Sequence, residues 1–155
     1  MEIEQRVKVV EVMALDMDPA VVVDVDTPLV EVMGRMSAAK TGCSLVTRDG
    51  LLAGIITERD VTQKIYGHDG ALKQPVSDWM TPDPECVVRT DSIRRTVRLM
   101  QRGGFRNVPV VDEEGRVVGC VRHKDFINYL GEHYAERVMN LPPESGKAHT
   151  VREGA

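Results

Sequence analysis

The sequence predicts a mixed fold of the α+β (α/β) class, built from two tandem βαββα units. The first observation is size: 155 residues, 42% of them hydrophobic and 28% charged, suffice for a core without disulfides or metals. The second is an internal repeat, because the chain matches itself without a gap when it is shifted by 65 residues. The third is the order of apolar runs in each copy, which indicates strand, helix, strand, strand, helix.

The repeat sets the domain limits. Gly54 matches Gly119 and Asp60 matches Asp125, with the apolar positions between them mostly kept. We expect an N-terminal helix over 1–11, units over 12–70 and 71–132, the end of a C-terminal helix over 133–141, and a disordered tail over 142–155.

Local signals predict each element in turn. β-branched runs after a proline predict first strands over 20–25 and 85–88. Apolar residues at helical spacing predict helices over 29–39 and 93–102, with Thr27 and Ser92 as N-caps. Paired apolar runs around an acidic-Gly turn predict hairpins, 43–46 with 52–56 and 107–111 with 117–121. The last helix of each unit should begin near Thr57 or Arg122.

Charge and composition exclude several classes of protein. The net charge of −4 argues against a nucleic-acid partner, which requires a strong basic excess. No apolar run approaches the ~20 residues that a membrane-spanning helix needs, and the start lacks the layout of a signal peptide. We therefore expect a cytoplasmic protein without membrane association.

The cysteines predict core packing. Cys43, Cys86 and Cys120 show no metal-ligand spacing with each other or with histidine, so we expect no metal site. In the 65-residue match each of them aligns with an aliphatic residue of the other copy. Buried thiols are therefore favoured over a redox site.

The junction from Gly54 to Asp60 carries the best candidate chemistry. Here a strand runs into a helix N-terminus, whose unpaired amides favour a phosphate, and Thr57 adds a hydroxyl. The Asp60 carboxylate could accept two hydrogen bonds from a ribose diol. The alternative is a capping box between Thr57 and Asp60. Asp is short for that motif, and the second copy keeps Asp125 while Arg122 replaces the cap, so we favour a functional role.

These motifs resemble cystathionine-β-synthase-type (CBS) domains. The resemblance rests on the Gly-x-x-Thr-x-x-Asp junction at 54–60, the segment GGFRNVPVVD at 103–112, and the WMTP leader at 79–82, and it covers about 12–130. Two such domains in tandem are similar to a Bateman module. The resemblance implies that the two domains pack sheet to sheet around a pseudo-twofold axis, leaving two clefts for adenosine-containing ligands.

The resemblance also implies the residues of each cleft. The first cleft would combine Ile55, Thr57, Asp60, Glu85, Cys86, Phe105, Arg106, Asn107 and Pro109. The second would combine Val21, Thr41, Gly42, Ser44, Arg122 and Asp125. Arg122 stands where the family has Thr or Ser, and a segment without proline replaces the family's proline-containing one. We therefore expect one competent cleft and one weak cleft.

Arg122 allows three interpretations. Its own charge could fill the phosphate position, it could clamp a longer polyphosphate bidentately, or it could be a solvated surface arginine. The expectation is a weak second cleft.

The predicted function is a regulatory sensor of an adenine nucleotide (AMP, ADP or ATP) or another adenosyl compound, which signals by conformational change. The resemblance implies a homodimer, and the output must pass to an unidentified effector protein. No nucleophile–base set, paired acids or Walker-type loop is present, so neither an enzyme nor a catalytic cofactor is expected. The alternative is a ligand-free dimerisation scaffold, in which Thr57 and Asp60 only cap a helix.

Overall fold

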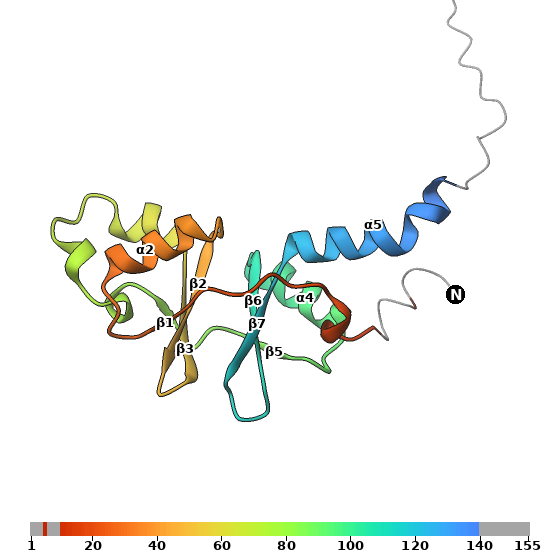
Figure 1. Ribbon diagram of the computed structural model, residues 1–155, viewed down its shortest axis with the longest axis horizontal. Coiled ribbons are helices and arrows are strands. Elements are labelled where there is room, and N and C mark those ends of the chain that lie inside the picture. Colours follow the sequence, from red (N-terminus) through yellow and green to blue (C-terminus); the bar gives the residue numbers. More distant parts are fainter. Residues whose placement is uncertain (1–4, 6–9, 140–155) are drawn as a thin grey trace, which may run out of the picture.

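Two small sheets, each built mainly from one repeat, lie side by side at the centre of the molecule (Figure 1). The computed structural model describes residue 5 and residues 10–139. The first sheet, ordered β1-β2-β3-β4, contains β1 (Val22–Asp24), β2 (Cys43–Arg48), β3 (Leu51–Thr57) and β4 (Thr81–Pro82). The second, ordered β5-β6-β7, contains β5 (Val87–Val88), β6 (Asn107–Val111) and β7 (Val117–Arg122). In each unit a parallel pair precedes an antiparallel hairpin, which confirms the predicted α+β units.

Helices cover the outer side of each sheet (Figure 1). They are α2 (Leu29–Ala38), α3 (Glu58–Asp60), α4 (Ile93–Gly103) and α5 (His123–Met139), with a π-helical turn η2 (Val61–Ile65) after α3 and 3-10 turns η1 (Val12–Ala14), η3 (Ala71–Lys73) and η4 (Val76–Asp78). The predicted cap of α4 is confirmed, because the Ser92 hydroxyl accepts the Arg95 amide at 3.2 Å. The predicted cap of α2 is wrong. Thr27 closes the preceding turn through its amide, and Pro28 takes the N-cap position.

The hydrogen-bond register corrects the internal repeat at one point. Val46 pairs with Gly54, and Val110 pairs with Gly119. The strands before the hairpin therefore match at an offset of 64 residues and those after it at 65. The additional residue lies in the second hairpin turn, so the gap-free match is wrong upstream of that turn. The counterpart of Cys43 is Asn107, because both begin their hairpins.

Each unit has its own core, but the leader of each packs on the other. Val12 and Leu15 lie in the core of the second unit, and the Val12 amide donates to Asp91 O at 2.8 Å. Val76, which leads into the second unit, lies in the core of the first, and its amide donates to Thr27 O at 2.9 Å. The two units are therefore tied together by exchanged segments as well as by their sheets.

The chain ends fall partly outside this description. Most of the helix expected over 1–11 and the tail expected over 142–155 lie outside the described residues. Within the described part, the end of that first helix is wrong: Val10 is not helical, and Glu11 forms a bridge with Ser92. The C-terminal helix is present, and α5 is described as far as Met139.

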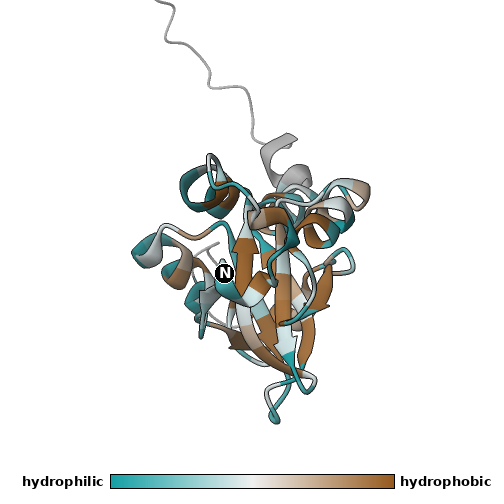
Figure 2. Cartoon of the chain, turned by 90° about the vertical axis from the view of Figure 1, so that its left-hand side faces the viewer, coloured by the Kyte–Doolittle hydropathy of each residue, from teal (hydrophilic) through white to brown (hydrophobic). Residues whose placement is uncertain are grey.

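The two sheets face one another across a third, interface cluster. Buried side chains from both sheets form it: Cys43, Leu45, Ile55 and Cys120. Leu51 and Arg116, which are equivalent positions in the two hairpins, form a bridge with each other, as a pseudo-twofold axis between the units requires. Apolar residues run along the strands of both sheets (Figure 2). Burying one leucine there contributes about 1.5–3 kcal/mol, so the interface is a substantial part of the stability.

Candidate functional site

The first strand–helix junction is held by a complete capping box. Asp60 Oδ2 accepts the Thr57 amide at 2.8 Å and the Thr57 hydroxyl at 3.0 Å. The Thr57 Oγ1 in turn accepts the Asp60 amide at 3.4 Å. Lys64 Nζ lies 2.8 Å from Asp60 Oδ1. Both oxygens of this buried carboxylate are therefore already bonded within the first unit.

The second junction repeats part of that arrangement. Asp125 is only 3% exposed, and its Oδ2 accepts the Arg122 amide at 2.7 Å. Burial raises the pKa of Asp125 above its ordinary value, although the hydrogen bond from Arg122 opposes this. The second copy lacks the full capping box, as the sequence indicates, because a guanidinium cannot accept a hydrogen bond, but Asp125 still bonds to the Arg122 amide. Because the acid caps a backbone amide in both copies, its recurrence does not by itself indicate a ligand.

A cluster of charges distinguishes the second junction. The Arg122 guanidinium forms an ion pair with Asp18 and lies 4.0 Å from Asp125. Lys124 Nζ is 3.0 Å from the same Asp18 oxygen. These two cations hold the pKa of Asp18 below its ordinary value. The Arg122 side chain is only 14% exposed, which rules out the solvated surface arginine.

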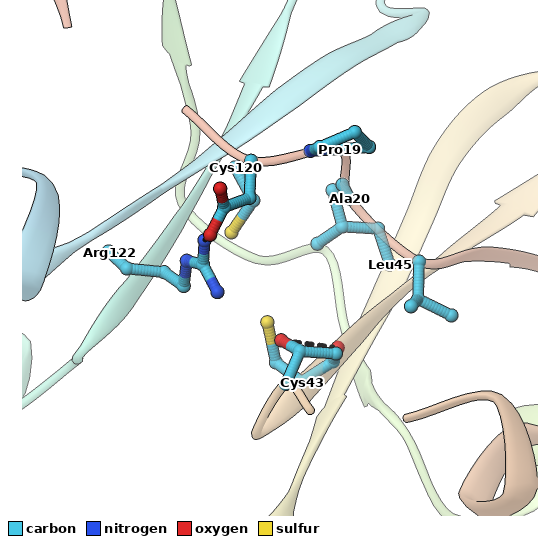
Figure 3. Close-up of a pocket in the computed structure, with 9 residues that line it drawn as sticks. Pro19, Ala20, Cys43, Leu45, Cys120 and Arg122 are labelled. Atoms are coloured by element: carbon cyan, nitrogen blue, oxygen red, sulfur yellow. Dashed lines mark hydrogen bonds and ion pairs between the residues drawn. The ribbon is translucent and has the colours of Figure 1, made fainter. Parts of the chain in front are cut away.

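Arg122 also lines a small cavity between the two sheets (Figure 3). This cavity measures about 10 Å³, room for about one water molecule. Its other walls are Asp18, Pro19, Ala20, Val21, Thr41, Cys43, Leu45 and Cys120. Three residues expected in the second cleft, Val21, Thr41 and Arg122, are therefore brought together.

Ser44 differs from that expectation. Side chains alternate along a strand, and Cys43 and Leu45 face the interface while Val46 faces the core of the first unit. Ser44 shares the Val46 side, and its hydroxyl donates to Val21 O at 3.2 Å. With the corrected register, Leu45 rather than Ser44 is the counterpart of Pro109.

Two cysteines, Cys43 and Cys120, line this cavity. Figure 3 shows the Cys43 and Cys120 side chains extending from opposite sheets towards the same space. Hydrogen bonding with the Cys120 thiol lowers the pKa of Cys43, whereas the same contact, with burial, raises the pKa of Cys120. Both side chains are buried, as predicted, but Cys86 is only half-buried, and burial raises its pKa.

A larger hollow lies beside Asp125, outside the interface. It measures about 150 Å³. Of the residues expected in the second cleft, Asp125 alone lines it. The other lining residues are Ala14, Asp16, Asp18, Lys124, Asn128, Tyr129 and Glu132. Sequence reasoning missed this hollow because it depends on how residues 14–18 cross the start of α5.

The residues expected in the first cleft come from both units. Ile55 is buried in the interface cluster. Asn107 and Pro109 stand on β6, paired with Arg122 and Cys120. Glu85 and Cys86 precede β5; Glu85 is exposed and Cys86 is half-buried. Within the described residues, no hydrogen bond or ion pair joins Thr57 or Asp60 to these partners from the second unit.

Phe105 and Arg106 lie in the turn between α4 and β6. The Phe105 ring lies over the Cα of Gly103, so close that a side chain there would collide with it. The carbonyl of Arg106 accepts the His123 amide at 3.1 Å. Its guanidinium is exposed and makes no ion pair within the part of the chain that the structure describes. The equivalent hydrogen bond in the first unit runs from Glu58 to Gly42, so Gly42 is the counterpart of Arg106.

The fold and the paired junctions define a tandem repeat of one domain type, and comparison identifies that type. The chain belongs to the CBS-domain family, whose model, described as CBS domain, matches residues 9–67 and 76–132. The CBS domain-containing protein CBSCBSPB5 of Arabidopsis thaliana is 35% identical over 131 residues, 83% of this chain and 23% of that protein. Protein MJ1225 of Methanocaldococcus jannaschii is 34% identical over 94 residues, 61% of this chain and 33% of that protein. The chain thus spans a third or less of these two relatives.

Solved CBS structures share the fold over most of the chain. The CBS-domain containing protein ATU1752 from Agrobacterium tumefaciens is 31% identical, with a TM-score of 0.69 and coverage of 77% of this chain and 98% of that one. PAE2072 from Pyrobaculum aerophilum, complexed with AMP, gives 22% identity, a TM-score of 0.68 and coverage of 75% and 89%. The CBS domain pair of MJ0100, in complex with 5′-methylthioadenosine and S-adenosyl-L-methionine, is 21% identical, with a TM-score of 0.71 and coverage of 80% of this chain and 98% of that one. Below 25% identity these last two support the fold alone.

Within 10–139, no group of three or more His, Cys, Asp or Glu side chains could hold a metal ion. No helix of that region combines the length and the apolar character that crossing a membrane requires.

Proposed function

We propose that this CBS-domain pair is a regulatory module that binds an adenosine-containing ligand, such as AMP, ADP or ATP, in the first cleft. The observation that carries the proposal is the first junction, where a hydroxyl, a buried carboxylate and a helix N-terminus lie together. Two solved CBS structures of the same fold, PAE2072 and MJ0100, contain adenosine compounds, which supports this ligand class.

In this proposal Asp60 receives the ribose hydroxyls. An ionised carboxylate has about four acceptor positions, and three of them are taken by the Thr57 amide, the Thr57 hydroxyl and Lys64. A diol donates two hydrogen bonds, so one internal donor must leave. Of these donors, the Lys64 ammonium is the exposed one. If it left Asp60, it would add a cation near the phosphate of the ligand.

The second unit supplies the remaining walls. We propose that Ile55, Cys86 and Pro109 line the adenine site, that Glu85 and Asn107 add polar contacts, and that Phe105 borders it. Arg106 has no ion-pair partner among the described residues, so its guanidinium can pair with a phosphate without breaking an existing contact. The ligand would bridge both domains and stabilise the arrangement that it fits best.

Thermal unfolding tests the proposal most simply. AMP, ADP, ATP, S-adenosylmethionine and NADH are added separately to the whole chain. A ligand present at about 100 times its Kd should stabilise the fold by about 2.7 kcal/mol, and the shift should vanish in Asp60→Ala. No shift with any of the five would contradict the proposal.

The second candidate function is an interaction scaffold without a ligand. The complete capping box favours it, because Thr57 and Asp60 already satisfy each other. In either case we propose a homodimer formed through the helices and an effector protein that receives the signal. Exposed apolar side chains on α2 and α5, Val30, Ile127 and Leu130, suit such a surface. Sedimentation of Ile127→Glu tests the dimer, and the variant should be monomeric.

The same proposal assigns no catalysis to this module. Binding and conformational change would account for its role, and incubation with each bound nucleotide should give no product. Turnover of any of them would contradict a purely regulatory role.

A further inference from the structure

The Asp18 carboxylate occupies the two cations that stand at the second cleft. One of its oxygens contacts both the Arg122 guanidinium and, at 3.0 Å, the Lys124 ammonium. Asp18 reaches them from a segment more than a hundred residues away in the chain, and it lines both the interface cavity and the hollow beside Asp125. A carboxylate between two cations has the place and the charge that a ligand phosphate would need.

Arg122 stands at the position equivalent to Thr57, where the first cleft offers a neutral hydroxyl. Its guanidinium is mostly buried, donates through Nη2 to Asp18 and lies 4.0 Å from Asp125, so a bidentate phosphate contact through Nη2 would have to displace Asp18. The position equivalent to Arg106 is Gly42, so this cleft has no second arginine to replace it.

The surroundings add to the negative charge. The hollow is lined by four acidic residues, Asp16, Asp18, Asp125 and Glu132, and Lys124 is its one lysine or arginine. A phosphate that approached Arg122 from this hollow would meet these carboxylates and would have to displace Asp18. An uncharged nucleoside would avoid both costs, and the Oδ1 of Asp125 has no hydrogen-bond partner within the described residues.

We propose that Asp18 determines the ligand class of the second cleft, by excluding phosphate-bearing nucleotides in favour of uncharged adenosine compounds. This inference rests on the proposed function, because it concerns the second site of the same adenosine-binding module. It replaces the expected weak second cleft by one of different specificity.

The test uses the whole chain with the first cleft disabled. In Asp60→Ala, calorimetric titration with adenosine and with AMP reports on the second cleft. Adenosine should bind there, and AMP should bind about tenfold more weakly or not at all. Adding Asp18→Asn should strengthen AMP binding about tenfold or more, the effect of one charge-assisted contact, while adenosine affinity changes by less than about threefold.

Asp16→Asn is the matched control. It removes the same charge from the same hollow, but Asp16 forms no ion pair within 4.0 Å with Arg122 or Lys124. We expect it to change both affinities by less than about threefold, since only a diffuse, screened charge is lost. If Asp60→Ala proves unfolded by circular dichroism, Asp60→Asn, which keeps the side-chain size, serves in its place.

Several results would overturn the proposal. These are AMP binding as tightly as adenosine or more tightly while Asp18 is present, an equal gain for both ligands in Asp18→Asn, and no binding of either in any variant. The unmodified chain separates this failure from that of the proposed function. If it binds AMP in an Asp60-dependent manner, only the role of Asp18 fails. If it binds no adenosine compound, the proposed function fails as well.

Discussion

The two strand–helix junctions share a backbone and an aspartate but differ in every charge around them. In the first, Asp60 bonds to Thr57 and Lys64, both within a few residues. In the second, Asp125 caps the Arg122 amide, and Arg122 pairs with the distant Asp18. The shared aspartate is explained by capping. In the proposed function, ligand choice therefore depends on what differs: Thr57 against Arg122, and Arg106 against Gly42.

The largest expected effect concerns what both clefts have in common. Leu45 is fully buried between the sheets, so Leu45→Ala should lower the free energy of unfolding by about 2–5 kcal/mol. Urea unfolding measures this, with Leu72→Ala as the control, because Leu72 is exposed. Equal effects of the two substitutions would contradict a contribution of the interface to the free energy of unfolding. The stability would then come from the separate cores of the two units.

The comparison between the two aspartates comes next. Asp60→Ala should weaken AMP binding about tenfold to a hundredfold, the value of hydrogen bonds to a charged group, while Asp125→Ala should change it little. Both variants lose the carboxylate that accepts a backbone amide at the start of a helix, so both should lose stability. Calorimetric titration separates the two properties. Equal losses of AMP affinity in both variants would contradict unequal clefts.

A smaller effect tests the phosphate contact alone. Arg106→Ala should weaken AMP about tenfold but leave adenosine nearly unchanged, because only AMP carries a phosphate. Arg102→Ala, which removes the same charge from the exposed end of α4, is the matched control. Loss of both ligands in Arg106→Ala would instead indicate that the turn between α4 and β6 had been disturbed.

The smallest effect is a pH dependence of stability. The pKa of Asp18 is lowered by Lys124 and Arg122, so its contribution is fully present above its ordinary value of 3.8 and is lost as the pH falls through the lower folded value. The difference in Tm between the unmodified chain and Asp18→Asn should therefore be present at neutral pH and disappear in strong acid. It should also shrink in high salt, because Asp18 is exposed. A difference that grows on acidification would contradict these ion pairs.

Much of the fold was predictable because it is local. Turn residues, β-branched runs and helical spacing set the strands and helices, and β6 begins and ends where the sequence predicts. The one-residue gap in the repeat was missed, because apolar residues align with apolar residues at either offset. The exchange of leader segments was also missed, since it depends on which core the segments reach in space rather than on their composition.

In the candidate site, too, the contacts between neighbouring residues were predictable and those between distant residues were not. The Thr57–Asp60 contact lies within one helical turn, and its spacing suggests a capping box. The sequence disfavours that box because Asp is short for the motif, but the structure shows it complete. The ion pair between Asp18 and Arg122 joins residues 104 positions apart, and no local pattern reveals such a contact. The 65-residue offset also hid that Arg106 corresponds to Gly42, which is the substitution that most clearly separates the two clefts.

The most direct test of unequal clefts is the number of AMP molecules bound by each unmodified chain. Calorimetric titration, repeated with adenosine, gives this number without any substitution. The account predicts one AMP for each chain, lost in Asp60→Ala, and a second site that only adenosine fills. Two equivalent AMP sites for each chain, or a single site that persists in Asp60→Ala, would contradict it.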